Sequence, residues 1–264
     1  MNEACPYREP KCADLTCDCP KYLAWVDVQQ PGAVEQIITE QGFNVDLPAW
    51  DLMVDMQRSF AARMHRVEGL TKDEVDTWVD RYLVCIDDEL REAREHLSLY
   101  DDRGPETAEQ QAELRKEVID VAHFMMDLFI VGGADAEKIK QTYSHRYLNS
   151  RQLLPTEDLI TVAYRQQCGD VLSYLNAAGQ TDDITMLKAL CRLADACGQV
   201  RQQISWKHWK RPSPSIDFGK LHAAFALVFH EFINLCILTM EPEDVRSVYI
   251  TKNAENIRRQ AHGY

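Results

Sequence analysis

Two acidic segments in the first half of the chain have the spacing of metal-binding carboxylates. Glu89 and Glu92 lie three residues apart in one segment, and Glu117 and Asp120 lie three apart in the next. Residues three or four apart share one face of an α-helix. Carboxylates on facing sides of neighbouring helices repel one another and need a cation, and their hard oxygens suit Mg²⁺ or Mn²⁺. The pattern therefore predicts a divalent-metal site between two helices.

The same acids have a second interpretation, which the spacing alone leaves open. Arg91 and Arg94 belong to the first acidic segment. They can pair with its acids on a solvated helix face that holds no metal. His123, on the polar arc of the second segment, lies either beside a metal-bound carboxylate or on a polar stripe without a role.

The end of the chain gathers cations and amides in the segment YITKNAENIRRQAHGY, residues 249–264. Lys252 and Arg259 are seven residues apart, so on a helix they face the same side, with Asn256 between them. The formal net charge of the chain is −13. A local cluster of cations in so acidic a chain indicates an anion, and the Arg fork can hold two phosphate oxygens at once. The segment therefore predicts a phosphate-binding helix.

The elements that position these residues are helices. Apolar residues recur at spacings of three and four, and neither a βαβ pattern nor a glycine-rich phosphate loop occurs. Glycines, prolines and aspartates separate the periodic segments, and Thr156 is the expected N-cap of one helix. The sequence predicts an all-α fold. The expected helices are 47–67, 72–98, 106–131, 135–150, 157–178, 183–204, 216–239 and 242–261.

An internal echo relates two parts of the chain. Residues 134–152 resemble residues 240–260, and each segment follows a long apolar helix. This favours two helical halves related by a pseudo-twofold axis. At the offset of the echo, alanines of the second half stand at the positions of Glu117 and Asp120. We therefore expect one composite site in each chain.

Length and charge exclude some classes of protein. A chain of 264 residues can bury a sizeable core. The net charge of −13 argues against a nucleic-acid partner, which needs a basic footprint. No apolar run is expected to span a membrane, and the first residues lack the apolar stretch of a secretory signal. We expect a cytoplasmic protein, in its own cell or in a host.

The first residues are rich in cysteine. Cys5, Cys12, Cys17 and Cys19 lie in a segment with prolines and no helical periodicity. Four thiolates can form a closed structural Zn²⁺ site, although this spacing is not that of a standard zinc finger. The alternative is a disordered leader with incidental cysteines. We divide the chain into this leader with its connecting segment, residues 1–46, and a helical domain, residues 47–264.

The acidic and C-terminal motifs together resemble the dimeric all-α dUTPase family, within the wider MazG-like group of nucleoside triphosphate pyrophosphohydrolases. The acidic match is E-x-x-E at Glu89 and Glu92 and E-x-x-D at Glu117 and Asp120. The more specific match is at the C-terminus, in Tyr249, Lys252, Asn253, Asn256, Arg259, Gln260, Gly263 and Tyr264.

This resemblance implies a homodimeric helical bundle that hydrolyses dUTP to dUMP and pyrophosphate. The four carboxylates of the two acidic motifs would hold Mg²⁺ and take part in catalysis. The residues that would bind phosphate are Lys252, Asn256, Arg259 and Tyr249. The residues that would contact the base or another part of the substrate are Gln57, Trp206, Lys207, Lys210 and Tyr264.

The chain departs from the family pattern in ways that leave alternatives. Gln57 matches a base-reading glutamine, but Ala61 stands where the family has an asparagine, so cytosine or a modified pyrimidine is an alternative base. The family's W-K-x-W-K element occurs here only at residues 206–210, after the acidic motifs. It either brings cations to the phosphates or ends a helix. A non-catalytic helical binding protein derived from such an enzyme is the alternative function.

Overall fold

The computed structural model describes residues 32–97, 108–178, 183–207 and 215–261. Across these ranges the backbone forms α-helices joined by turns and contains no β-strand, which confirms the predicted all-α class. The helices are α2 (Ala33–Glu40), α3 (Ala49–Met64), α4 (Lys72–Glu95), α5 (Ala108–Val131), α6 (Ala136–Tyr147), α7 (Leu159–Ala178), α8 (Asp183–Arg201), α9 (Phe218–Thr239) and α10 (Pro242–Ala261).

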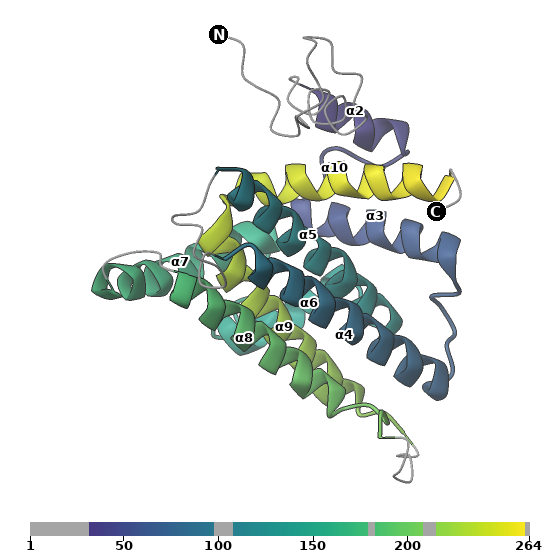
Figure 1. The fold of residues 1–264 in the computed structure, drawn as a ribbon. Coiled ribbons are helices and arrows are strands. Elements are labelled where there is room, and N and C mark those ends of the chain that lie inside the picture. Colours follow the sequence, from purple (N-terminus) through teal and green to yellow (C-terminus); the bar gives the residue numbers. More distant parts are fainter. Residues whose placement is uncertain (1–31, 98–107, 179–182, 208–214, 262–264) are drawn as a thin grey trace.

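Every helix predicted from the sequence occurs, with ends that agree to within three residues. The prediction missed α2, which lies inside the segment assigned to the leader. This helix buries Ile38 completely and packs against α10 (Figure 1). Just after it, the backbone carbonyl of Val45 accepts a hydrogen bond from Arg246 of α10 at 3.0 Å. The later part of segment 1–46, predicted to hold the leader and its connecting segment, therefore packs against the helical domain, and the boundary at residue 46 stays a prediction.

The start of α4 is fixed by a capping box. The Thr71 side chain accepts a hydrogen bond from the Glu74 backbone N–H, and the Glu74 carboxylate accepts one from the Thr71 backbone N–H at 2.7 Å. These reciprocal bonds satisfy two backbone donors that a helix N-terminus leaves unpaired. Beyond the cap, one face of α4 buries Val79, Ile86 and Leu90, and α4 makes its most extensive contact with α5.

Asp158 ties the start of α7 to the start of α3. Its Oδ2 accepts a hydrogen bond from the Thr161 backbone N–H at 2.9 Å, which is the capping contact of α7. Its Oδ1 accepts one from the Trp50 backbone N–H, also at 2.9 Å. The prediction that Thr156 caps this helix is therefore wrong, because α7 begins at Leu159 and Asp158 is its N-cap. The same aspartate also accepts the backbone N–H of Trp50 near the start of α3.

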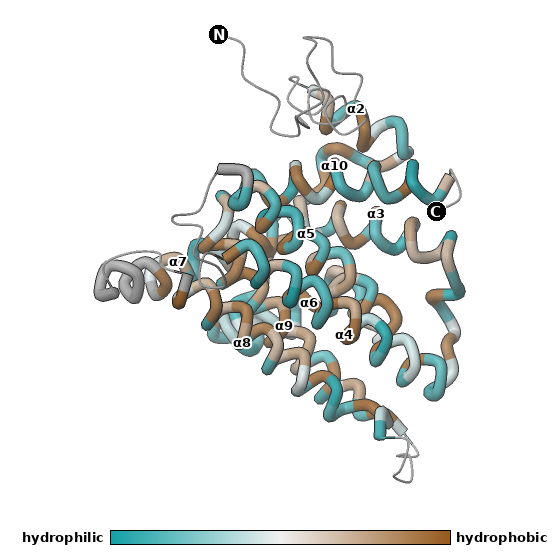
Figure 2. The backbone as a smooth tube through the Cα atoms, in the orientation of Figure 1, coloured by the Kyte–Doolittle hydropathy of each residue, from teal (hydrophilic) through white to brown (hydrophobic). Residues whose placement is uncertain are grey.

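The most apolar helix, α9, runs through the middle of the bundle (Figure 2). By length and composition it is able to cross a membrane, so the expectation that no apolar run has that length is wrong. It packs against α5, α6, α7 and α8, and 61% of its most apolar window is buried inside the protein. The core helix of a globular bundle passes the same test.

The helices follow one another as two similar series, α3 to α6 and α7 to α10. Helix α4 packs against α5 as α8 packs against α9, and α6 packs against α9 as α10 packs against α5. Two halves related by a twofold axis, in which the last helix of each half packs against the other half, would make these contacts. The contacts support the pseudo-twofold arrangement, which stays a prediction. As a result, α10, at the end of the chain, lies beside α3 and α5 of the first half (Figure 1).

Candidate active site

Three of the four predicted metal ligands come together where α4 faces α5. Glu89, Glu117 and Asp120 each offer a carboxylate oxygen, and these oxygens lie within 4.8 Å of one another. All three side chains are partly buried. We call this group the carboxylate cluster. An all-oxygen donor set of this kind fits Mg²⁺ or Mn²⁺, as the chemistry of the acidic motifs predicts.

The electrostatics of the carboxylate cluster show a shortage of positive charge. Burial, together with repulsion from Asp120 and Glu117, raises the pKa of Glu89 to about 8. Burial also raises the pKa of Asp120, while Lys252 opposes that rise. A carboxyl group stays protonated near neutral pH when burial and nearby negative charges disfavour its ionised form and no cation compensates them. A divalent metal would supply that charge.

Lys252 of α10 provides part of the missing charge from within the chain. Its Nζ lies 2.8 Å from Oδ2 of Asp120, and each side chain is only 16% exposed. His96, just after α4, places its Nε2 3.6 Å from Oε1 of Glu117. The C-terminal helix thus meets the acidic helices within one chain, and the composite site expected from the sequence stays a prediction.

Glu92, the fourth predicted ligand, lies outside the carboxylate cluster. Its Oε1 is 3.2 Å from the guanidinium of Arg91, and its side chain is 44% exposed. Arg91 also binds Asp88 at 2.9 Å. The interpretation of the acidic segment as a solvated face with Arg91 as partner therefore describes Glu92 and Asp88, whereas Glu89 turns inward to the cluster.

The predicted phosphate-binding residues occupy two environments on α10. Arg259 forms an ion pair with Glu255 on its own helix, and Asn256 is half-buried beside it. Tyr249 is instead fully buried, and its hydroxyl donates a hydrogen bond to Oε1 of Gln57 at 2.8 Å. Arg259 therefore lies on the accessible part of the helix, Lys252 is mostly buried against Asp120, and Tyr249 is completely buried.

A second group of polar side chains is buried one helical turn from the carboxylate cluster. We call it the buried polar cluster. It lies where α3, α5 and α10 meet, and its members are Gln57, His123, Asp127, Tyr249 and Asn253. His123 Nδ1 lies 2.9 Å from Gln57 Oε1, and its ring stacks on that of Tyr249 with centroids 4.2 Å apart.

Burial controls the charge state of this second group. It lowers the pKa of His123 to about 3, so the imidazole is neutral. It raises the pKa of Asp127 to about 7, against the opposing effect of a hydrogen bond from Gln57. Asp127 was not among the site residues predicted from the sequence. The signal for it was an acid inside the apolar run FMMDLFIV, four residues after His123.

The described part of the tryptophan–lysine element, Trp206 and Lys207, lies away from the carboxylate cluster. The Trp206 ring lies 5.8 Å from the guanidinium of Arg201, which pairs with Asp80 at 3.1 Å and with Asp87 at 3.5 Å. Asp80 and Asp87 precede Glu89 by nine and two residues, so they lie on about the opposite face of α4. Lys207 sits beside Trp206, with its Nζ 5.1 Å from the ring.

The remaining predicted site residues lie outside the residues that the structure describes. They are Lys210, Tyr264 and the leader cysteines Cys5, Cys12, Cys17 and Cys19.

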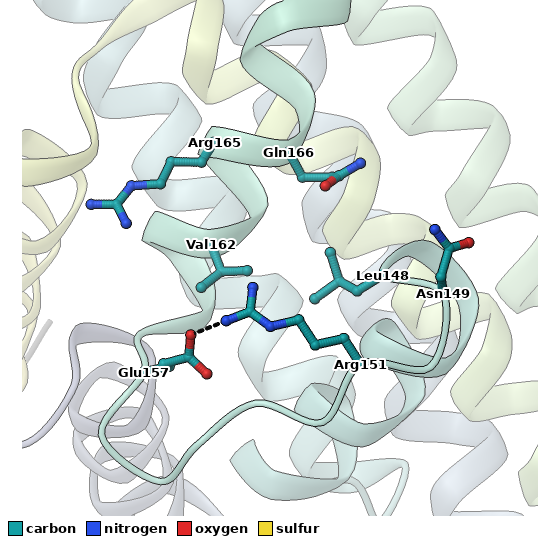
Figure 3. A pocket seen from close by; sticks show the side chains of 7 residues that line it. All are labelled: Leu148, Asn149, Arg151, Glu157, Val162, Arg165 and Gln166. Carbon is teal, nitrogen blue, oxygen red and sulfur yellow. Dashed lines mark hydrogen bonds and ion pairs between the residues drawn. The ribbon is translucent and has the colours of Figure 1, made fainter.

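Two surface hollows lie away from the carboxylate cluster. One, of about 230 Å³, lies at the connection from α6 to α7, where Arg151 pairs with Glu157 and Arg165 points away from that pair (Figure 3). The other, of about 540 Å³, is lined by one face of α3 and by the loop after it, including Arg58 and His65. None of the three clustered carboxylates lines either hollow.

Comparisons with known proteins place this geometry in context. A family model described as dUTPase matches residues 49–204, more than half of the chain. A DNA replication protein of Enterobacteria phage T4 is 27% identical, over 39% of this chain and 33% of that protein. A dCTP pyrophosphatase of the same phage is also 27% identical, over 40% of this chain and 79% of that protein. The chain therefore spans about a third of the first relative's length. No solved structure gives a significant match.

We expect the metal-free protein to lose stability as the pH rises from about 4.5 toward about 8. The folded pKa of Glu89, about 8, exceeds that of an unfolded glutamate, about 4.3. Across this window the folded state keeps a proton that the unfolded state releases, so the contribution is present at low pH and is lost as the pH rises. One group contributes at most roughly 1.4 kcal/mol for each pH unit.

Thermal unfolding in chelator at several pH values measures this effect. Because Asp120 and Asp127 also have raised pKa values, the informative quantity is the difference between the wild type and Glu89→Gln. The variant should lose less stability over the window, and added Mg²⁺ should restore the wild type near pH 8. Parallel pH profiles for the two proteins would contradict the prediction.

Proposed function

We propose, since this chain belongs to the all-α dUTPase family of nucleotide pyrophosphohydrolases, that it hydrolyses a pyrimidine deoxynucleoside triphosphate to the monophosphate and pyrophosphate. The sequence expectation of dUTP as substrate is part of this proposal. One observation carries it: three carboxylates on α4 and α5 face a lysine of α10. With a divalent metal held by the carboxylates on one side and Lys252 on the other, such a site would neutralise the charge of a triphosphate.

The carboxylates and the cations have separate tasks in this reaction. Glu89, Glu117 and Asp120 would hold Mg²⁺, which supplies charge neutralisation and lowers the pKa of a bound water. Lys252 exchanges its contact with Asp120 for a phosphate oxygen, and Arg259 leaves Glu255 to bind another. A cluster carboxylate accepts the proton of the water that attacks the α-phosphorus. The bond from that phosphorus to the bridging oxygen then breaks, and pyrophosphate leaves.

The proposal also includes the oligomeric state and the location of the enzyme. The protein acts as a homodimer in the cytoplasm of its own cell or of a host, as the resemblance implies, with a nucleotide as its ligand. A Zn²⁺ site at the leader cysteines is a separate prediction that this mechanism does not use.

A second candidate substrate is dCTP. The T4 relative that the chain covers for most of its length is a dCTP pyrophosphatase. In addition, Ala61 stands where the family pattern has an asparagine, and it is buried with 2% of its surface exposed. An alanine there has no amide to read the base. The choice between uracil and cytosine therefore falls on other residues of the site.

Release of pyrophosphate from a panel of nucleotides tests the function. With Mg²⁺ present, we expect dUTP or dCTP to be hydrolysed at least about tenfold faster than dATP and dGTP, a difference of about 1.4 kcal/mol. Excess chelator should abolish the activity. Hydrolysis that persists in chelator would contradict the metal mechanism. Binding of nucleotides without hydrolysis of any of them would favour the non-catalytic binding protein.

Substitution of the carboxylates tests their assignment. We expect Glu89→Gln and Asp120→Asn to lower turnover by about two orders of magnitude or more, since each removes a charged ligand at nearly constant volume. Glu92→Gln should also lower it, because the exposed pair with Arg91 is worth only about 0–1 kcal/mol and yields to a divalent cation.

Asp88→Asn is the matched control for Glu92→Gln. Asp88 is on the same helix and pairs with the same Arg91, but it is 62% exposed and outside the carboxylate cluster. Its substitution should leave turnover within about twofold of the wild type. Equal activities for the two variants would show that Glu92 is a surface residue.

The two neighbouring arginines of α10 test the phosphate-binding face. We expect Arg259→Ala to weaken kcat/KM by about 1–3 kcal/mol, the scale of a lost charge-assisted contact. Arg258→Ala should have much less effect, because Arg258 is exposed and points about 100° away on the helix. Both changes remove the same charge. Equal small losses in steady-state kinetics would mean that the face does not bind the substrate.

A further inference from the structure

An acid lies inside the predicted phosphate-binding face of α10. Glu255 is three residues after Lys252 and four residues before Arg259, so the three side chains share one side of the helix. Its Oε1 forms an ion pair with the guanidinium of Arg259, and the two side chains are 33% and 39% exposed. A negative charge weakens an anion-binding site, so its position among these cations needs an explanation.

One explanation for the pair is local. A glutamate four residues before an arginine stabilises a helix slightly, and exposed pairs of this kind contribute little to the stability of a protein. This accounts for the ion pair between Glu255 and Arg259. It does not account for the place of the acid, between the two cations that the proposed reaction uses.

Each cation of this face is held by a carboxylate in the structure. Nζ of Lys252 lies 2.8 Å from Oδ2 of Asp120, and Arg259 holds Glu255. Carboxylate and phosphate groups both bind the guanidinium fork through their oxygens. Glu255 therefore makes the contact that a phosphate oxygen would make with Arg259. Burial raises the pKa of Asp120, and the charge of Glu255 adds to that rise, so Glu255 also acts on the carboxylate cluster.

The two acids differ in what they gain when a nucleotide binds. Asp120 belongs to the carboxylate cluster, so a metal can replace Lys252 as its partner. Glu255 lies outside that cluster, and Arg259 is its one ion-pair partner within the described part of the chain. Once a phosphate takes Arg259, the carboxylate of Glu255 has no cation and lies beside a polyanion. Glu255 therefore opposes the binding of that phosphate.

The order of residues along α10 indicates which phosphate Arg259 would reach. Tyr249 bonds Gln57, the predicted base contact, and Lys252 bonds Asp120 of the carboxylate cluster. Arg259 follows Lys252 by seven residues, about 10 Å along the helix axis. The helix thus runs from the base side, past the carboxylates, to the terminal phosphates. These are the phosphates that leave as pyrophosphate.

We propose that Glu255 competes with the terminal phosphates of the substrate for Arg259, and that its recapture of Arg259 promotes the release of pyrophosphate. The proposal rests on the proposed function, because pyrophosphate is a product of that reaction. Glu255 is a positioning residue that acts through Arg259 and takes no part in bond breaking. Removal of its charge should strengthen anion binding at this end of the site, whereas loss of a merely stabilising ion pair would not.

Titration calorimetry with inorganic pyrophosphate and Mg²⁺ tests this competition in the full-length protein. We expect Glu255→Gln, which removes the charge at nearly constant volume, to lower the Kd of pyrophosphate by about three- to tenfold. A Kd equal to or above the wild-type value overturns the proposal.

Glu243→Gln is the matched control for the change in net charge. Glu243 is an exposed acid in the first turn of α10, about 18 Å from Glu255 along the helix axis. Salt screens a charge at that distance, so the Kd of this variant should equal the wild-type value. Equal gains in Glu243→Gln and Glu255→Gln would show an effect of net charge alone and would overturn the proposal.

A double-mutant cycle shows whether the effect depends on Arg259. In the Arg259→Ala background, Glu255→Gln should keep at most about half of its effect on the free energy of pyrophosphate binding, because only direct repulsion remains. An equal effect in both backgrounds would mean that Glu255 repels anions without competing for Arg259, and that result contradicts the proposal.

Inhibition by the two products separates this proposal from the proposed function. For Glu255→Gln we expect the Ki of pyrophosphate to fall by the same factor as the Kd, with a lower KM for the triphosphate. The Ki of the nucleoside monophosphate should stay unchanged, because it has no terminal phosphates. An equal fall in both Ki values would mean that Arg259 binds the α-phosphate and would overturn the proposal. A wild-type protein that hydrolyses no nucleotide overturns the proposed function alone, since the calorimetric Kd values still decide whether Glu255 competes for Arg259.

Discussion

The repulsion among Glu89, Glu117 and Asp120 is the constraint on which the rest of the structure depends. Their carboxylate oxygens lie within 4.8 Å of one another, and partial burial limits the screening that water provides. Protonation of Glu89, whose pKa is raised to about 8, relieves part of this repulsion near neutral pH, and an opposing force between α4 and α5 must offset the rest. The apolar seam between the two helices supplies it, since Val79, Ile86 and Leu90 of α4 are almost completely buried.

Helix α10 reduces the repulsion among the three carboxylates, and the residue that does so is also a predicted phosphate ligand. It packs against α3 and α5 and places Lys252 at 2.8 Å from Asp120. An ammonium group on a flexible stem can leave a carboxylate once a metal arrives, and it can then bind phosphate. The interaction that stabilises the metal-free bundle is thus one that the bound state gives up. The end of the chain contributes both to the fold and to the site for this reason.

The sequence predicted the features that depend on local spacing, and it failed where distant residues meet. Helix boundaries followed from apolar periodicity and breaker residues, so they agreed closely with the structure. The cap of α7 did not, because Asp158 also bonds Trp50, which is 108 residues away in the sequence. Spacing placed Glu92 with Glu89 on one face, but it could not show that Arg91 would hold Glu92 at the surface. Asp127 was missed because its partner Gln57 is on another helix.

The two halves of the bundle differ in the polar groups that they bury. The Tyr143–Gln167 pair packs against Phe229, and Oε1 of Gln167 is buried without a partner among the described residues. The matching Tyr249 region instead holds a neutral histidine and an acid whose pKa burial raises to about 7. Groups of this kind reduce stability unless a ligand satisfies them. The second half contributes the apolar helix α9, which packs against α5 and α8. The burial of this helix offsets the cost of the buried polar groups in the first half.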